Sequence, residues 1–120
     1  MGNIYSEKMI EAYSFGQMVV NGERFTSDLI ITPTGIKRSW WRKSGHNLCL
    51  EDLKEALSEE AEALVIGTGF TGLMKVEEEV RLFAQSKGMS FVTKKTAEAV
   101  KTFKRLSSQK KTIGAFHLTC

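Results

Sequence analysis

Three closely spaced glycines follow an apolar run and form the first place in the chain where chemistry could occur. The run at 63–66 is followed by Gly67, Gly69 and Gly72. Glycine loops at the end of a strand leave backbone N–H groups open to an anion, so the pattern favours a site for a phosphate or another small anion. The residues that would form this ligand loop are Gly67, Thr68, Gly69, Phe70, Thr71, Gly72 and Lys75.

The glycine spacing matches the dinucleotide fingerprint only formally. That fingerprint needs an acidic residue about 20 positions later for the ribose, and the chain has Thr93, Lys94 and Lys95 there. A P-loop is excluded because no Gly-Lys-Ser or Gly-Lys-Thr follows. We therefore expect no cofactor. Two interpretations stay open, namely a tight turn that needs positive φ and a site for a non-nucleotide anion or small ligand.

A second candidate surrounds two adjacent tryptophans. Neighbouring residues of a strand point to opposite faces, so only one indole can enter the core. An exposed tryptophan beside arginine is typical of protein-contact surfaces. The alternative is that both rings cover a small sheet, with the arginine stacked across an indole. The interaction patch expected here consists of Trp40, Trp41, Arg42, Lys43 and His46.

Two cysteines are the remaining candidates for chemistry. Cys49 lies where a helix is expected to begin, and a helix dipole would lower the pKa of its thiol; the alternative is a small buried residue. Cys120 follows His117 by three positions, which places the two on opposite faces of a strand, so both are expected to be structural. No metal-ligand spacing and no catalytic triad order is present, so we expect no metal site and no catalytic residues.

Composition and charge set the class of protein. With 120 residues, 42% of them hydrophobic, we expect one domain over 1–120, in which 1–12 form a short N-terminal extension. No apolar run could span a membrane and no secretory signal is seen, so the expected location is the cytoplasm. Acidic residues gather in 51–79 and basic residues in 87–111. The basic residues alternate with apolar ones at helical spacing, which argues against nucleic-acid binding.

The pattern of apolar residues predicts a mixed α/β domain. Alternating residues and the Asn21-Gly22 turn indicate strands at 15–20 and 23–26, and two more are expected at 28–32 and 36–41. Helical spacing follows at 50–57, 76–84 and 96–106, the last with Thr96 as its N-cap. Strands are expected at 63–66, 89–93 and 112–118. This order, a β-meander followed by α-β-α-β-α-β, predicts a three-layer domain with a mixed central sheet.

Several short motifs together resemble one family. They are Ser14-Phe15-Gly16, Trp41-Arg42, Glu51-Asp52-Leu53, the run 64–69, Thr96 with Ala99, and the tetrapeptide at 117–120. The chain from Ser14 to Cys120 is thus similar to the Mth-type domain family, which includes an adipogenesis-associated member and, more distantly, an assembly factor of respiratory complex I. The resemblance implies a compact three-layer fold and no established enzymatic activity. One departure is Phe103-Lys104, where members often have an aromatic residue followed by asparagine.

Two functions follow from these observations. The first is a non-enzymatic interaction or assembly domain whose partner is another protein or a second copy, with the tryptophan segment as its contact surface. The second is a protein, with or without enzymatic activity, that binds a small ligand or anion at the Gly67 to Gly72 loop. A thiol-dependent activity at Cys49 or Cys120 ranks third.

Overall fold

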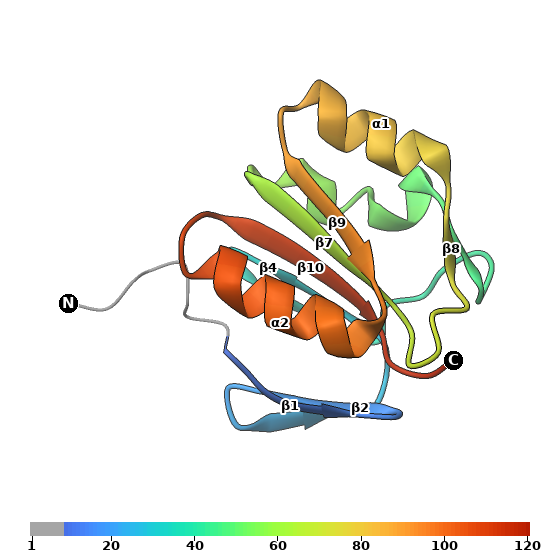
Figure 1. Ribbon diagram of the computed structural model, residues 1–120, viewed down its shortest axis with the longest axis vertical. Coiled ribbons are helices and arrows are strands. Elements are labelled where there is room, and N and C mark those ends of the chain that lie inside the picture. The colour runs from blue at the N-terminus through green and yellow to red at the C-terminus, as the bar shows by residue number, and fades with distance from the viewer. Residues whose placement is uncertain (1–8) are drawn as a thin grey trace.

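A computed structural model describes residues 9–120 and shows the three expected layers (Figure 1). The first part of the chain forms a small antiparallel sheet of β1 (Ile10–Ser14), β2 (Gln17–Val20) and β3 (Glu23–Phe25). The turn between β2 and β3 has positive φ at both Asn21 and Gly22, as the Asn-Gly signal predicts.

The N-terminal extension expected at 1–12 is wrong in its last residues, because β1 begins at Ile10. Residues 1–8 lie outside the described part of the chain, but Ile10 belongs to β1 and its side chain is fully buried beside Met18 and Phe25. Residues 10–12 are therefore part of the folded domain. The strand carries few apolar residues, so its pattern is weak in the sequence.

A five-stranded mixed sheet forms the central layer. Its order is β5 (Gly35–Lys37), β4 (Leu29–Thr32), β10 (Thr112–His117), β7 (Ala63–Thr68) and β9 (Ser90–Lys94). β10 pairs in parallel with β7, which pairs in parallel with β9, whereas β4 runs antiparallel to both β5 and β10. β10 is the central strand and all six of its residues are buried, so the chain carries its C-terminal strand through the middle of the domain.

Two cores lie on the two faces of this sheet. On one face, α2 (Thr96–Ser107) and the small sheet enclose a core in which the rings of Phe103 and Phe116 meet edge to face. On the other face, α1 (Glu78–Ser86) and the 45–58 region enclose a core that contains Trp40, Leu53 and Ile113. α1 ends at Ser86, and Gly88 follows its C-cap with a φ of +70°, as predicted for a glycine that stops a helix. Within residues 9–120, no helix is long and apolar enough to cross a bilayer.

The helix expected at 50–57 is replaced by two 3₁₀ segments, Leu50–Leu53 and Ala56–Ser58. In an α-helix the carbonyl of Asp52 would accept the N–H of Ala56. It instead accepts the indole Nε1–H of Trp40 at 2.9 Å. A tertiary contact thus accompanies the change from the expected α-helix to short i to i+3 turns.

Two further expectations are corrected at the ends of helices. β8 (Lys75–Val76) pairs with β6 (Asn47–Leu48), so a short strand separates the glycine loop from α1, which begins at Glu78. Thr96 is not the N-cap of α2, because Lys95 holds that position. The hydroxyl of Thr96 instead donates to the carbonyl of His117 at 2.6 Å.

Candidate functional site

The glycine loop leaves the carboxyl end of β7, as predicted. Gly69 has a φ of +111° and Gly72 a φ of +80°, a region that favours glycine. A Cβ on Gly69 would also lie 2.4 Å from the backbone carbon and oxygen of Cys120, closer than any carbon contact allows. Both the dihedral angle and the close approach therefore require glycine at position 69.

The hydrogen-bond donors of the loop bind the chain's own last residues. Phe70 N donates to Thr119 O at 2.7 Å and Leu73 N to Cys120 O at 3.0 Å. The hydroxyl of Thr71 also donates to Cys120 O. Gly69 N donates to the hydroxyl of Thr96 at 2.9 Å. The N–H groups of residues 69, 70 and 73 are thus already paired, which favours the tight-turn interpretation of the glycines.

The tryptophan segment does not form one surface, which corrects the five-residue patch expected from the sequence. Trp40 is 4% exposed and Arg42 is buried, whereas Trp41 is 76% exposed and Lys43 and His46 are also on the surface. One indole is exposed, as predicted, but not because the two residues alternate along a strand: β5 ends at Lys37, so the strand expected at 36–41 is shorter and both tryptophans follow it. The guanidinium of Arg42 lies 4.7 Å from the centre of the Trp40 ring, so the stacking considered above occurs inside the protein.

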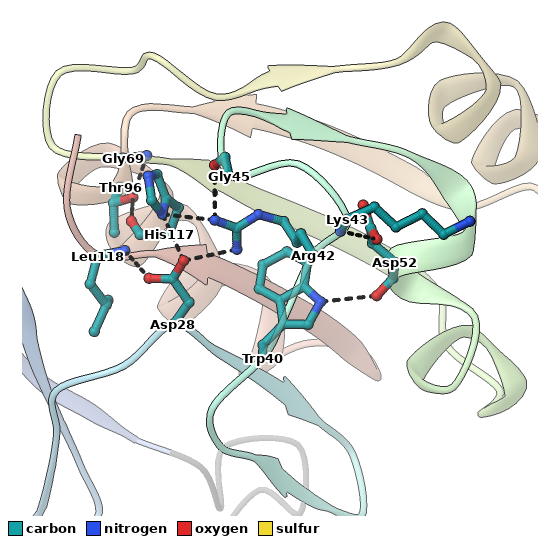
Figure 2. Close-up of polar contacts among 10 residues, drawn as sticks. All are labelled: Asp28, Trp40, Arg42, Lys43, Gly45, Asp52, Gly69, Thr96, His117 and Leu118. Carbon is teal, nitrogen blue, oxygen red and sulfur yellow. Dashed lines mark hydrogen bonds and ion pairs between the residues drawn. The ribbon is translucent and has the colours of Figure 1, made fainter.

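A largely buried polar cluster joins Asp28, Arg42 and His117, three residues that are far apart in the sequence (Figure 2). Oδ2 of Asp28 lies 2.7 Å from Nδ1 of His117 and 2.8 Å from Nη1 of Arg42. Oδ1 of Asp28 accepts the backbone N–H of Leu118 at 2.8 Å, and Nη2 of Arg42 donates to Gly45 O at 3.1 Å. The cluster therefore ties β10 to the residue before β4 and to the segment that follows β5.

The hydrogen bonds assign the tautomer of His117. Its Nδ1 is closer to the Asp28 carboxylate than to Arg42, which lies at 3.2 Å, so we assign the ring proton to Nδ1, from which it is donated to Asp28. The other ring nitrogen, Nε2, is buried without a hydrogen-bond partner among residues 9–120. The exposed ring of His46 stands edge-on to that of His117, with 6.3 Å between their centres.

The charge of Asp28 is stabilised by its partners. Burial alone would raise the pKa of this carboxyl group, but the hydrogen bonds from His117, Leu118 N and Arg42 outweigh burial and lower the pKa below its usual value. Asp28 is thus ionised at neutral pH and pairs with Arg42. An aspartate that orients a histidine is also the supporting half of a catalytic triad. Nε2 of His117, however, is not accessible to solvent. The geometry of Asp28, Arg42 and His117 is therefore that of a structural cluster.

No local sequence pattern could have revealed this cluster. Asp28 precedes β4 as an ordinary turn residue, Arg42 follows the tryptophans, and His117 ends β10. The pairing of β4 with β10 brings Asp28 close to His117, and the segment between β5 and β6 adds Arg42. The one available signal is that His117 and Arg42 border apolar segments, where charged or titratable side chains need a buried partner.

The two thiols differ from the expectation for a reactive cysteine. Cys49 is half-buried, and no α-helix begins there to lower its pKa. Burial raises the pKa of this thiol, and the carboxylate of Asp52, which accepts its S–H at 3.3 Å, raises it further. Cys120 is exposed and its backbone oxygen is bound by the glycine loop. In residues 9–120, no group of three or more potential ligands could hold a metal ion.

One hollow on the surface of the described residues lies at the opposite end of the sheet from the glycine loop. It has a volume of about 830 Å³ and is bordered by residues at or near the amino ends of β7, β9 and β10, among them Glu62, Ser90 and Lys111. Charged residues of both signs line it. It contains none of the residues singled out in the sequence, and no histidine or cysteine.

Comparisons with known proteins identify the fold and the family. The chain is similar to a conserved hypothetical protein of Pyrococcus horikoshii, with 29% sequence identity and a TM-score of 0.81. The match covers 92% of this chain and 98% of that one. A Bartonella henselae structure described as an outer membrane protein matches at 27% identity and a TM-score of 0.79, covering 95% of this chain and 97% of that one. A Bordetella pertussis protein described as a Mth938-like domain shares the fold, with 19% sequence identity and a TM-score of 0.70. That match covers 94% of this chain and 87% of the other.

The expected fold class and the resemblance to the Mth-type domain are thereby confirmed. Residues 10–118 match the model of the family described as protein of unknown function DUF498/DUF598. The chain belongs to this family.

Proposed function

We propose that this domain binds another protein and has no catalytic activity of its own. The observation that carries the proposal is the exposure of Trp41, whose indole is 76% accessible. Large exposed aromatic side chains are concentrated at protein-contact surfaces, where they contribute much of the binding energy. Lys43, two residues further on, is also exposed and adds a charge at the rim.

The polar groups that could support catalysis are engaged in holding the fold. Asp28 and Arg42 neutralise each other, and Nε2 of His117 is buried. The glycine-loop donors at residues 69, 70 and 73 are paired within the chain. An anion-binding function, the alternative from the sequence, would require an anion to displace residues 119–120 from the loop. Isothermal titration with inorganic phosphate tests it, and we expect no heat of binding.

The resemblance to the Mth-type domain favours assembly as the kind of interaction. An adipogenesis-associated protein and an assembly factor of respiratory complex I belong to that wider group, and we propose by analogy that this chain, too, contributes to the assembly of a protein complex. We further propose a cytoplasmic location, in which Cys49 and Cys120, both free thiols, stay reduced.

Photo-crosslinking at Trp41 tests the proposal. The photoreactive residue benzoylphenylalanine replaces Trp41 in the full chain, and a second variant carries it at Lys101, an exposed position of α2. We expect position 41 to give a discrete crosslinked protein, identified by mass spectrometry, that position 101 does not give. A crosslinked second copy would indicate self-association. The proposal would be contradicted if both positions gave the same crosslinked proteins, or if position 41 gave no crosslinked protein.

A further inference from the structure

A second exposed surface lies where the glycine loop meets the turn between β1 and β2. Phe15, Phe70 and Leu73 are 56%, 51% and 55% exposed. Phe15 belongs to the turn, and Phe70 and Leu73 belong to the loop. Three lysines, Lys75, Lys94 and Lys95, are exposed in or beside the same loop. We call these six residues the aromatic-lysine surface.

The apolar part of this surface is held in one arrangement. The rings of Phe15 and Phe70 meet edge to face with centres 5.6 Å apart, and Tyr13 lies 6.5 Å from Phe70. The backbone fixes both segments to the last residues of the chain, since Gly16 N donates to Leu118 O and Phe70 N donates to Thr119 O. A surface whose rings are ordered before binding loses little conformational entropy when a partner arrives.

The lysines are placed by contacts with the same loop. The side chain of Lys95 lies against Gly72, its Cγ 3.1 Å from the place a Cβ would occupy. The hydroxyl of Thr68 donates to the carbonyl of Lys94 at 3.2 Å. Lys75 directly follows the loop as the first residue of β8. The three lysines therefore lie in segments that adjoin the loop, at the β9–α2 junction and at the start of β8.

The segments that form this surface carry an excess of basic residues. The segments that form it, 13–17, 68–75 and 94–96, contain three lysines and no acidic residue. None of these lysines forms an ion pair with another residue of 9–120, whereas Lys37, Lys101 and Lys111 each have a glutamate partner. A partner with carboxylates would supply the missing negative charge, and apolar side chains would cover the rings.

We propose that the aromatic-lysine surface is the docking site for an acidic segment of a partner protein that also carries large apolar side chains. This inference deepens the proposed function and rests on it. The partner's apolar side chains pack on Phe15, Phe70 and Leu73. Its carboxylates pair with the lysines, whose long stems let the ammonium groups reach across the rim.

Fluorescence anisotropy of a labelled peptide tests the docking site. The peptide is Glu-Phe-Asp-Leu repeated twice, and a control peptide has lysine in place of every acidic residue. We expect the acidic peptide to bind the wild-type chain and the basic peptide not to bind. Phe70→Ser and the double change Lys94→Glu with Lys95→Glu should each weaken binding at least tenfold. The affinity should also fall as salt is added, because the lysines are exposed.

Leu82→Ser is the matched control, because Leu82 is an apolar residue of α1 that is also half exposed. It should leave peptide binding unchanged, and thermal melting should show that Phe70→Ser keeps the fold. The proposal is overturned if the acidic peptide does not bind, if the basic peptide binds equally well, or if Leu82→Ser weakens binding as much as Phe70→Ser.

Two further measurements distinguish this proposal from a lipid-binding surface and from the interaction function proposed for Trp41. Binding to phosphatidylserine vesicles that is lost in Phe70→Ser, without peptide binding, would identify a lipid surface and overturn the protein-segment proposal. If the peptide fails but crosslinking at Trp41 still captures one protein, the docking site is wrong and the interaction function stands. If the crosslinking fails as well, both are wrong.

Discussion

The Asp28–Arg42–His117 cluster and the aromatic-lysine surface both adjoin the end of β10, and they use charged and aromatic side chains in opposite ways. In the cluster, Arg42 stacks on Trp40 and pairs with Asp28 beneath the surface of the protein. On the surface, the lysines have no ion-pair partner among the described residues and the phenylalanine rings face solvent. Charged and aromatic side chains thus contact one another inside the protein in one region and are exposed to solvent in the other.

This difference indicates where stability and where function reside. Removing a partner from the cluster leaves a buried charge, which is costly, whereas removing a half-exposed ring or a solvated lysine costs little stability. Substitutions that unfold the chain should therefore fall in the cluster and the glycine loop, and substitutions that impair binding without unfolding should fall on the aromatic-lysine surface and at Trp41.

The largest effect is expected for Arg42→Ala. It removes the ion pair with Asp28, the hydrogen bond to Gly45 and the stacking on Trp40, and we expect a loss of about 3 kcal/mol in the free energy of unfolding. Urea denaturation measures it. The control is Lys43→Ala, at an exposed neighbouring position, which should change stability by less than about 0.5 kcal/mol. Equal losses in the two variants would show that the cluster is not a stabilising element.

Gly69→Ala should reduce the free energy of unfolding by a comparable amount. The added Cβ would overlap the backbone of Cys120, so residues 119–120 must leave the loop and the three hydrogen bonds from residues 70, 71 and 73 are lost, at about 1 kcal/mol each. Gly22→Ala is the matched control, because Gly22 has a φ of +82° and a Cβ added there would meet nothing within 4 Å. It should cost only about 1 kcal/mol. A Gly69→Ala loss no larger than the Gly22→Ala loss would refute the close approach.

Acid titration separates the largely buried carboxylate of Asp28 from exposed ones. The folded pKa of Asp28 lies below the unfolded value of about 3.9, so its contribution to stability is complete above that pH and is lost as the pH falls through the folded pKa. The difference in melting temperature between wild type and Asp28→Asn should therefore be largest near neutral pH and shrink in acid. Glu55→Gln, at an exposed ion pair, should show almost no such dependence. A difference that stays constant from neutral pH down through the folded pKa would contradict the assignment.

Local patterns predicted most of the elements, because their signals lie within a few residues. The Asn21-Gly22 turn, the unbroken apolar runs of β7 and β10, and the glycine after α1 each encode one backbone geometry. At 50–57 the expected helix is replaced by two 3₁₀ segments, and there the carbonyl of Asp52 accepts the indole N–H of Trp40, a residue outside the segment. The spacing of residues along the sequence does not indicate such a contact.

The sites were harder to predict than the fold for the same reason. The glycine motif was located correctly, yet the groups that fill it, residues 119–120, lie far along the chain and could not be assigned from spacing. The alternation rule predicted that one of Trp40 and Trp41 is exposed, but not that Arg42 would be buried with Asp28 and His117. Phe15 and Phe70 form a pair only because the β1–β2 turn and the loop both bind the end of the chain.

The smallest effect on stability is expected at the tryptophans, where the comparison can be made within two adjacent residues. Trp41 is 76% exposed, so Trp41→Phe should change the free energy of unfolding by less than about 0.5 kcal/mol. Trp41→Phe should, however, remove most of the fluorescence that acrylamide quenches in the wild type. The remaining fluorescence comes from the shielded indole of Trp40, whose Nε1–H donates to Asp52 O. Trp40→Phe should do the reverse, keeping the quenchable fluorescence and losing stability through the unpaired carbonyl and the lost stacking on Arg42. Equal quenching in the two variants would mean that Trp41 is covered in solution, and sedimentation velocity would then show whether a second copy covers it.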